Sequence, residues 1–231
     1  MSASAALRVP SPDLPDAPSV ARVVFGDGFD LAQRYAQRLA GDGVQRGLIG
    51  PREAERLWDR HLINSAVLTD LVPPGARVVD VGTGAGLPGI PMSIRRPDLA
   101  VDLVEPMQRR VTFLEEVVAE LGLGTRVRVV RGRAEDEAVA TEVGEADWVV
   151  ARAVAPLDRL VRWCLPLVAP GGHLLALKGS RAGSEVEEHR AAMRHAGAGR
   201  VDVTRIDVPG LDDSTWVVRV ERSRGRAKGR A

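Results

Sequence analysis

The 231-residue sequence contains little cysteine and few aromatic residues. Its single cysteine, Cys164, excludes an internal disulfide and a structural zinc site built from cysteines. Aromatic residues make up 3% of the chain and hydrophobic residues 45%, so we expect a core of valine, leucine, isoleucine and alanine. No segment approaches the roughly 18 apolar residues of a membrane span, and no basic-then-apolar signal pattern opens the chain. We therefore expect a soluble, cytoplasmic protein without a membrane partner.

The net charge is only +1, but the basic residues are unevenly distributed. Subtracting the five positive charges of residues 222–231, which include no acid, leaves −4 for the rest of the chain. Such a tail can follow a phosphate backbone by sequence-independent attraction, or it is a disordered terminus that aids solubility. On the first interpretation, Arg222, Arg224 and Arg226 contact RNA.

The chain divides into four predicted parts. Residues 1–20 contain four prolines and few large apolar residues, which predicts a disordered or extended arm. Residues 21–74 form a predicted helical cap, with helices at 28–40 and 52–71, and Pro73-Pro74-Gly75 ends it. An α/β domain is expected over 75–221, followed by the disordered basic tail, 222–231. Within the α/β domain we expect strands at 77–82, 100–105, 126–131, 147–152 and 172–178, and helices at 87–96, 107–122, 155–168 and 182–197.

The alternation of strands and helices predicts a parallel sheet with helices on both faces. The last two predicted strands, 200–208 and 215–221, are separated by only six residues. Because a parallel crossover needs a dozen residues or more, these strands should form an antiparallel hairpin. Five parallel strands followed by a hairpin are typical of a Rossmann-like methyltransferase rather than a dinucleotide dehydrogenase. The predicted fold is therefore α/β, with a mostly parallel, seven-stranded sheet.

A glycine loop follows the first predicted strand and has two interpretations. Gly84-x-Gly86-x-x-Gly89 fits the dinucleotide fingerprint, with Glu105, 19 residues after Gly86, on a ribose. Alternatively, an acid inside the strand, Asp80, is followed by glycines at alternate positions.

Charge separates the two interpretations. A buried acid repels a pyrophosphate but attracts the sulfonium and ammonium of S-adenosylmethionine. Asp80 would take the ammonium directly or through water, while Gly82 and Gly84 let the loop lie against the adenosine. Glu105 would accept hydrogen bonds from both ribose hydroxyls. The alternative is that Asp80 only satisfies amides of the loop.

A third contact region follows the third predicted strand, at Arg133-Ala134-Glu135. There the Ala134 backbone can bond an adenine ring nitrogen, and Glu135 can take the exocyclic amine. A polar surface loop is the alternative interpretation.

Several longer motifs follow one another in a fixed order between about residue 50 and residue 180. In these motifs the chain resembles the bacterial small-subunit ribosomal RNA guanine-N7 methyltransferases, the RsmG (formerly GidB) family. The extension of the glycine loop, Leu87-Pro88-Gly89-Ile90-Pro91, is far more specific than the glycines alone. The matching pieces are His61–Ser65, Asp80–Pro91, Glu105–Leu114, Arg133-Ala134-Glu135, Ala151-Arg152-Ala153 and Ala176-Leu177-Lys178-Gly179.

The resemblance implies methyl transfer from S-adenosylmethionine to N7 of one guanine in the decoding-region loop of 16S ribosomal RNA. The implied partner is this RNA or the small ribosomal subunit. Asn64 departs from the family, since many relatives have aspartate there, which puts a charge-based role at this position in doubt. The implied cofactor contacts are Gly82, Leu87, Ala134, Glu135 and Arg152, with Glu105 on the ribose.

Guanine N7 carries no proton, so the reaction needs no catalytic base; alignment and water exclusion suffice. Cys164, on an apolar helix, is predicted to be a core residue rather than a nucleophile. Arg152 ends the fourth predicted strand, where it could position the acceptor or bind the carboxylate of the methyl donor. Lys178 and Arg109 are predicted RNA contacts, although Arg109 also fits a solvated helix start. The histidines show no metal spacing, so we expect no metal, and a monomer suffices.

Three other functions stay open. The acceptor could be another RNA, a protein or a small molecule. An NAD-dependent oxidoreductase is disfavoured by Asp80 and the terminal hairpin. An RNA-binding assembly factor with a vestigial cofactor pocket would tolerate loss of Asp80 or Glu105.

Overall fold

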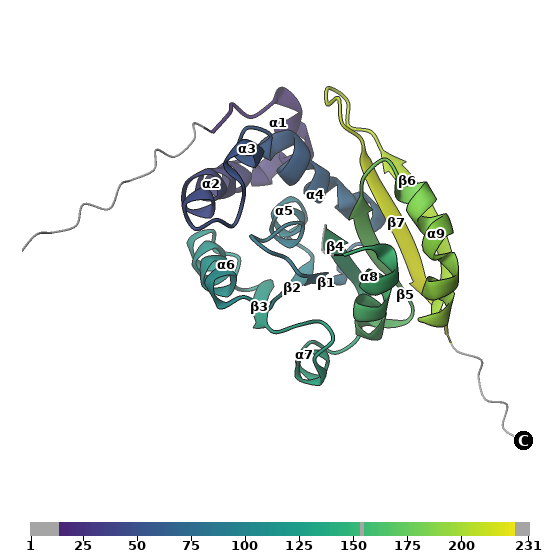
Figure 1. Cartoon of the computed structure of the whole chain (residues 1–231). Helices are drawn as coiled ribbons and strands as arrows, with labels where there is room; N and C mark the ends of the chain where they lie inside the picture. Colours follow the sequence, from purple (N-terminus) through teal and green to yellow (C-terminus); the bar gives the residue numbers. More distant parts are fainter. Residues whose placement is uncertain (1–13, 153–154, 225–231) are drawn as a thin grey trace, which may run out of the picture.

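A single mixed sheet organises the chain in the computed structural model, which describes residues 14–152 and 155–224. The strand order is β3-β2-β1-β4-β5-β7-β6 (Figure 1). Strands β1 to β5 are parallel, whereas β7 is antiparallel to β5 and β6, as the short link predicted. The predicted fold class is confirmed. The strands are β1 (Arg77–Val81), β2 (Ala100–Glu105), β3 (Val127–Arg131), β4 (Ala146–Arg152), β5 (Val168–Lys178), β6 (Ala198–Ile206) and β7 (Thr215–Arg222).

Both faces of the sheet are apolar because its strands alternate between two cores. Val150 and Leu175 point to one core, and their neighbours Val149 and Leu174 to the other. Such strands are nearly continuous apolar runs, as a sheet covered on both faces requires. The first core is covered by α5 (Gly89–Arg95) and α6 (Gln108–Glu120), and the second by α7 (Glu137–Val143), α8 (Leu157–Cys164) and α9 (Ala182–His195).

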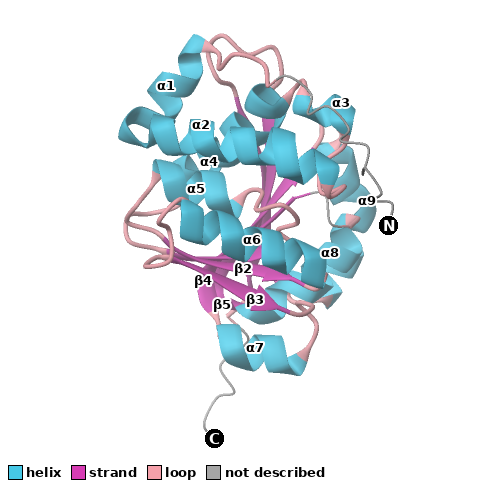
Figure 2. Ribbon diagram, turned by 90° about the vertical axis from the view of Figure 1, so that its left-hand side faces the viewer, coloured by secondary structure: helices cyan, strands magenta, loops and turns pink. Residues whose placement is uncertain are grey.

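The N-terminal helices pack onto the first core, at the top of Figures 1 and 2. They are α1 (Ser19–Phe25), α2 (Phe29–Arg38), α3 (Pro51–Ala54) and α4 (Asn64–Ala66). Trp58 stacks on Phe29, with ring centroids 5.9 Å apart. None of the helices in residues 14–152 and 155–224 combines the length and the apolar character needed to cross a membrane.

The structure departs from the predicted elements in several places. The expected helix over 52–71 is broken into α3, a π-helical segment (Leu57–Ile63), α4 and a 3₁₀ segment (Val67–Leu71). Helix α1 begins at Ser19, inside the predicted arm, and α7 was not predicted. Helix α8 ends at Cys164 rather than 168, because Pro166 has no N–H to continue it and the chain enters β5.

Candidate functional site

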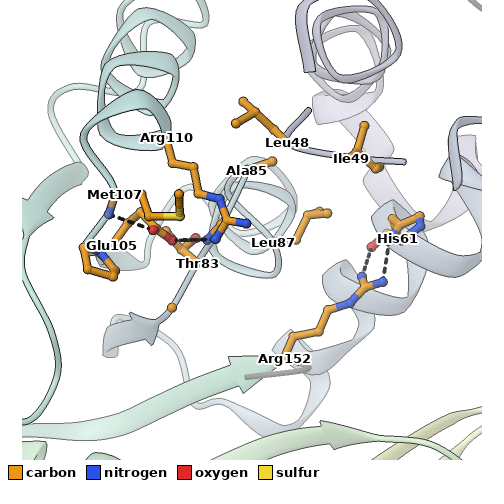
Figure 3. Close-up of a pocket in the computed structure, with 13 residues that line it drawn as sticks. Leu48, Ile49, His61, Thr83, Ala85, Leu87, Glu105, Met107, Arg110 and Arg152 are labelled. Carbon is orange, nitrogen blue, oxygen red and sulfur yellow. Dashed lines mark hydrogen bonds and ion pairs between the residues drawn. The ribbon is translucent and has the colours of Figure 1, made fainter. Parts of the chain in front are cut away.

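A cavity of about 430 Å³ lies at the carboxyl ends of β1, β2 and β4. The strand order reverses at this point of the sheet, which is where open α/β sheets bind ligands. Figure 3 shows Glu105, Met107 and Arg110 on one side of it and His61 and Arg152 on the other. It is lined by Leu48, Ile49, His61, Gly82, Thr83, Gly84, Ala85, Leu87, Glu105, Pro106, Met107, Arg110 and Arg152.

The glycine loop bends through three residues with positive φ, Gly82 at 65°, Gly84 at 64° and Gly86 at 106°. A Cβ on Gly84 would meet only the Gly82 carbonyl oxygen, at an ordinary 3.9 Å, so only its backbone angle demands glycine there. Gly86 is different, because a Cβ there would lie 2.4 Å from Ile90 Cδ1 and 2.8 Å from Tyr35 Oη. The buried Tyr35 hydroxyl donates to the carbonyl of Ala85 at 2.8 Å. Helix α2 therefore holds the loop that forms the floor of the cavity.

Asp80 is fully buried behind the loop and does not line the cavity. Its Oδ2 accepts hydrogen bonds from Thr83 Oγ1 at 2.6 Å and from the Gly89 amide at 2.7 Å. These contacts agree with the alternative interpretation given above, in which Asp80 accepts hydrogen bonds from the loop. Oδ1, however, is buried without a hydrogen-bond partner among the described residues. Burial raises the pKa of Asp80 to about 7.

Glu105 is the carboxylate that faces the cavity, although only 1% of its surface is exposed. Its Oε1 accepts the Met107 amide and its Oε2 the Gly84 amide, both at 3.0 Å. Arg110 Nη1 lies 3.5 Å from Oε2 (Figure 3). Two backbone amides thus fix the carboxylate at the end of β2, where it joins the glycine loop to the start of α6.

Arg152 forms the opposite wall, at the end of β4. Its Nη2 hydrogen-bonds His61 Nδ1, and its Nη1 donates to the His61 carbonyl and to Ser65 Oγ, both at 3.4 Å. His61 Nε2 lies 2.7 Å from Glu53 Oε2. Since a guanidinium only donates, the imidazole accepts at Nδ1 and donates from Nε2 to Glu53. Burial, with the charge of Arg152, lowers the pKa of His61 to about 4, so the imidazole is neutral near pH 7.

A second cavity of about 280 Å³ lies on the other side of Arg152. Lys178 Nζ is fixed there by the Ala155 carbonyl at 2.8 Å and by Glu185 Oε1 at 2.7 Å. Its described lining contains three cations and no carboxylate, so it suits an electron-rich ligand. The lining residues are Arg60, Asn64, Arg152, Leu177, Lys178, Gly179, Ser214 and Thr215.

The sequence model of the GidB family, described as rRNA small subunit methyltransferase G, matches residues 29–209. The chain belongs to this family. A ribosomal RNA small subunit methyltransferase G from Salinispora arenicola is 55% identical over 213 residues, 91% of this chain and 88% of that one. Its counterpart from Rhodococcus jostii is 54% identical over 207 residues, 90% of each chain. The Mycobacterium leprae protein is 58% identical over 181 residues, 78% of this chain and 72% of that one.

Solved structures share the fold at low sequence identity. A putative S-adenosylmethionine-dependent methyltransferase from Methanococcus maripaludis gives a TM-score of 0.56 at 13% identity, covering 83% of this chain and 92% of that one. Aeropyrum pernix fibrillarin, solved with bound S-adenosylmethionine, gives 0.52 at 17% identity, covering 70% and 74%. The fold of this member of the methyltransferase G family is thus that of known methyltransferases.

Five of the predicted cofactor residues line the first cavity of this methyltransferase G family member: Gly82, Gly84, Leu87, Glu105 and Arg152. Asp80, Ala134 and Glu135 do not. Ala134 is buried, and Glu135 is exposed, with Oε1 3.9 Å from Arg133 Nη1.

The predicted RNA contacts are scattered. Lys178 lines the second cavity, and Arg109 is exposed in the first turn of α6. The prediction that Arg222 belongs to a disordered tail is wrong, because it ends β7 and its Nη1 lies 2.7 Å from Glu145 Oε1. Arg224 is exposed just beyond β7, and Arg226 lies outside the described residues.

Sequence reasoning missed the apolar wall of the first cavity. Leu48 and Ile49 lie in the segment before α3, where no periodicity marks them. Met107, 40% exposed, could have been found from its place two residues after the strand end at Glu105. Tyr35 could not, because its contact with Ala85 spans 50 residues of sequence.

Proposed function

We propose that this chain transfers a methyl group from S-adenosylmethionine to N7 of a guanine in the decoding-region loop of 16S ribosomal RNA. The observation that carries the proposal is the arrangement of two adjoining cavities that share Arg152 as a wall. The first contains a buried carboxylate and the second is cationic. Membership in the methyltransferase G family supports small-subunit ribosomal RNA as the substrate.

The residues of the first cavity fit the methyl donor. Glu105 faces the cavity and Asp80 keeps one unpartnered oxygen behind it, so the electrostatics favour a cationic ligand over a pyrophosphate. Gly84 lines the cavity and has no side chain, so a ligand can approach its backbone. When bound, S-adenosylmethionine supplies an electrophilic methyl group on a positively charged sulfur.

Each side chain then has a defined task. Glu105 accepts the ribose hydroxyls, since a carboxylate offers about four acceptor sites and two backbone amides occupy only part of them. Leu87 and Met107 exclude water from the cavity. Ala134 and Glu135, which follow β3, are assigned to the adenine, and this assignment stays a prediction.

The second cavity takes the acceptor guanine. N7 must keep its lone pair free, so hydrogen-bond donors are useful only at the neighbouring O6, to which arginine and lysine donate readily. Arg152 and Lys178 present such donors. His61 is neutral and held between Glu53 and Arg152, so it orients Arg152 rather than removing a proton. Catalysis by alignment and exclusion of water matches this set of residues.

A monomer is the proposed active unit, since the chemistry proposed above needs no residue beyond those that line the two cavities. The proposed location is the cytoplasm, the compartment that holds ribosomal subunits. The family's substrate class supports this location.

The test uses methyl-labelled S-adenosylmethionine and small ribosomal subunits that lack the modification. After digestion, the label should appear in 7-methylguanosine. Arg152→Ala should lower kcat/KM by at least about a hundredfold, because it removes the wall between the cavities. Arg190→Ala is the matched control and should retain full activity, because Arg190 is exposed on α9 and its ion pair is with Glu187 on the same helix. Label in any other nucleoside, or full activity of Arg152→Ala, overturns the proposal.

A further inference from the structure

Strand β7 carries the chain from the catalytic edge of the sheet to the opposite edge. Because β7 is antiparallel to β5, Trp216 lies opposite Lys178 and Glu221 opposite His173. At about 3.3 Å per residue, the five steps from Trp216 to Glu221 span roughly 17 Å. The chain therefore leaves the sheet at the edge away from both cavities, in the lower part of Figure 1.

A third cavity, of about 350 Å³, lies at this opposite edge. Three guanidinium groups face it, from β6, from β7 and from the residues just after β7. We call the set of Arg200, Arg219, Arg224 and His173 the far-edge surface. The complete lining is Gly171, His173, Arg200, Asp202, Arg219, Glu221 and Arg224.

Arg219 is held in place before any ligand binds. Its Nη2 lies 2.8 Å from His173 Nε2, and its guanidinium carbon lies 5.5 Å from the centroid of the Trp148 ring. His173 itself stacks on Trp148 at 4.9 Å. Burial and the charge of Arg219 lower the pKa of His173, so the neutral imidazole can accept the guanidinium N–H. The remaining N–H groups of Arg219 stay available to an acceptor.

The charges of the cavity suit a ribose-phosphate backbone better than a small free anion. Arg200 pairs with Asp202 at 2.7 Å, and Glu221 also lines the cavity, so three guanidinium groups face two carboxylates. Guanidinium groups bind phosphates, and carboxylates can accept the 2′-hydroxyls that distinguish RNA.

We infer that the far-edge surface binds the RNA backbone at a second place on the substrate. This inference rests on the proposed function. The far-edge surface and the catalytic edge of the sheet are separated by roughly 17 Å along β7. The surface therefore contacts a part of the RNA away from the modified loop. It contributes to the affinity for the substrate and leaves the chemical step unchanged.

The test is the double variant R200E/R224E, which spares Arg219 and its packing on Trp148. Binding to unmodified small subunits and to naked 16S RNA is measured between about 50 and about 200 mM salt, alongside methylation. Each lost phosphate contact should reduce the slope of log K against log salt by about 0.7 to 0.9, so two contacts give about 1.5. We expect KM for subunits to rise about tenfold or more, while kcat and the Kd for S-adenosylmethionine stay at the wild-type values.

The matched control is R162E/R190E, two exposed arginines on α8 and α9 that give the same change in net charge. An equal loss in this control, or an unchanged salt slope in R200E/R224E, overturns the inference. A loss with subunits but none with naked 16S RNA also overturns it and indicates a ribosomal protein as the partner. Absence of 7-methylguanosine from the wild-type reaction contradicts the proposed function instead. The salt dependence of RNA binding is measured without the methylation reaction, so it tests the far-edge surface separately.

Discussion

Replacing Asp80 by asparagine should change how stability depends on pH. Burial raises the pKa of Asp80 from 3.8 to about 7 in the folded protein. Below pH 3.8 the carboxyl is protonated in both the folded and the unfolded state, so it does not change the free energy of unfolding. Between pH 3.8 and about 7 the folded state holds a proton that the unfolded chain has released. Stability therefore falls as pH rises, by up to about 1.4 kcal/mol per pH unit and by about 4 kcal/mol over the interval.

His61 titrates with the opposite sign and hides this trend in the wild type. Burial lowers its pKa from 6.5 to about 4, so between these values the unfolded chain binds the extra proton. That contribution to stability is present above pH 6.5 and is lost as pH falls. Because His61 is present in both proteins, its contribution cancels when the free energy of unfolding of wild type is subtracted from that of D80N. The free energy of unfolding of D80N minus that of wild type should rise by about 4 kcal/mol from pH 4 to pH 8.

Urea unfolding at pH 4, 5, 6, 7 and 8 measures the difference directly. Thr83→Val is the control, because it removes the hydroxyl that donates to Asp80 Oδ2 and leaves the carboxyl in place. Its stability relative to wild type should fall by about 1 to 2 kcal/mol above pH 7, where the Asp80 carboxylate is charged and keeps only the Gly89 amide as a donor. If the D80N and wild-type stability curves run parallel within about 0.5 kcal/mol, the reasoning on Asp80 is refuted.

Three further changes test the site. Tyr35→Phe should cost about 1 to 2 kcal/mol by leaving the Ala85 carbonyl without its donor, and should weaken S-adenosylmethionine binding severalfold in calorimetry; unchanged affinity would mean that the loop holds itself. Gly84 and Gly86 both have positive φ, so replacing either by alanine should cost about 1 to 2 kcal/mol of backbone strain. Gly86→Ala should cost about 1 to 3 kcal/mol more, because a Cβ there also meets Ile90 Cδ1 and Tyr35 Oη; equal losses in denaturant melts would contradict the packing argument. Burial raises the pKa of the Cys164 thiol, so alkylating reagents should leave the methylation rate unchanged, and rapid inactivation would return Cys164 to the catalytic candidates.

The sheet could be predicted because its signals are local. Strand and helix periods alternate along the chain, and the eight residues between β6 and β7, six between the predicted strands, are too few for a parallel crossover. Helix α7 escaped prediction because it buries only Val139 and Val143, one residue per turn, which is too sparse for a periodic pattern. The π-helical segment Leu57–Ile63 was equally invisible, since a shift in hydrogen bonding leaves no mark in the apolar spacing.

The candidate site was predictable only where strands end. Glu105 and Arg152 face one cavity because the carboxyl ends of parallel strands share an edge. Tyr35 was not predictable, since it reaches the glycine loop only through tertiary packing. The error at Arg222 has a physical cause too, because a basic composition suggested a solvated tail while Glu145 and the ladder with β6 hold the residue in β7.

The first hydrophobic core crosses from the N-terminal helices to the sheet without a break, joining Phe25, Trp58 and Leu62 to Val150 and Leu175. Segments that share one core unfold together, so the helices and the sheet should melt as one cooperative unit. The N-terminal helices then cannot be exchanged like a module, because another set would have to rebuild half of the interior. New acceptor preferences in this lineage would therefore arise by substitution within the existing helices rather than by recombination.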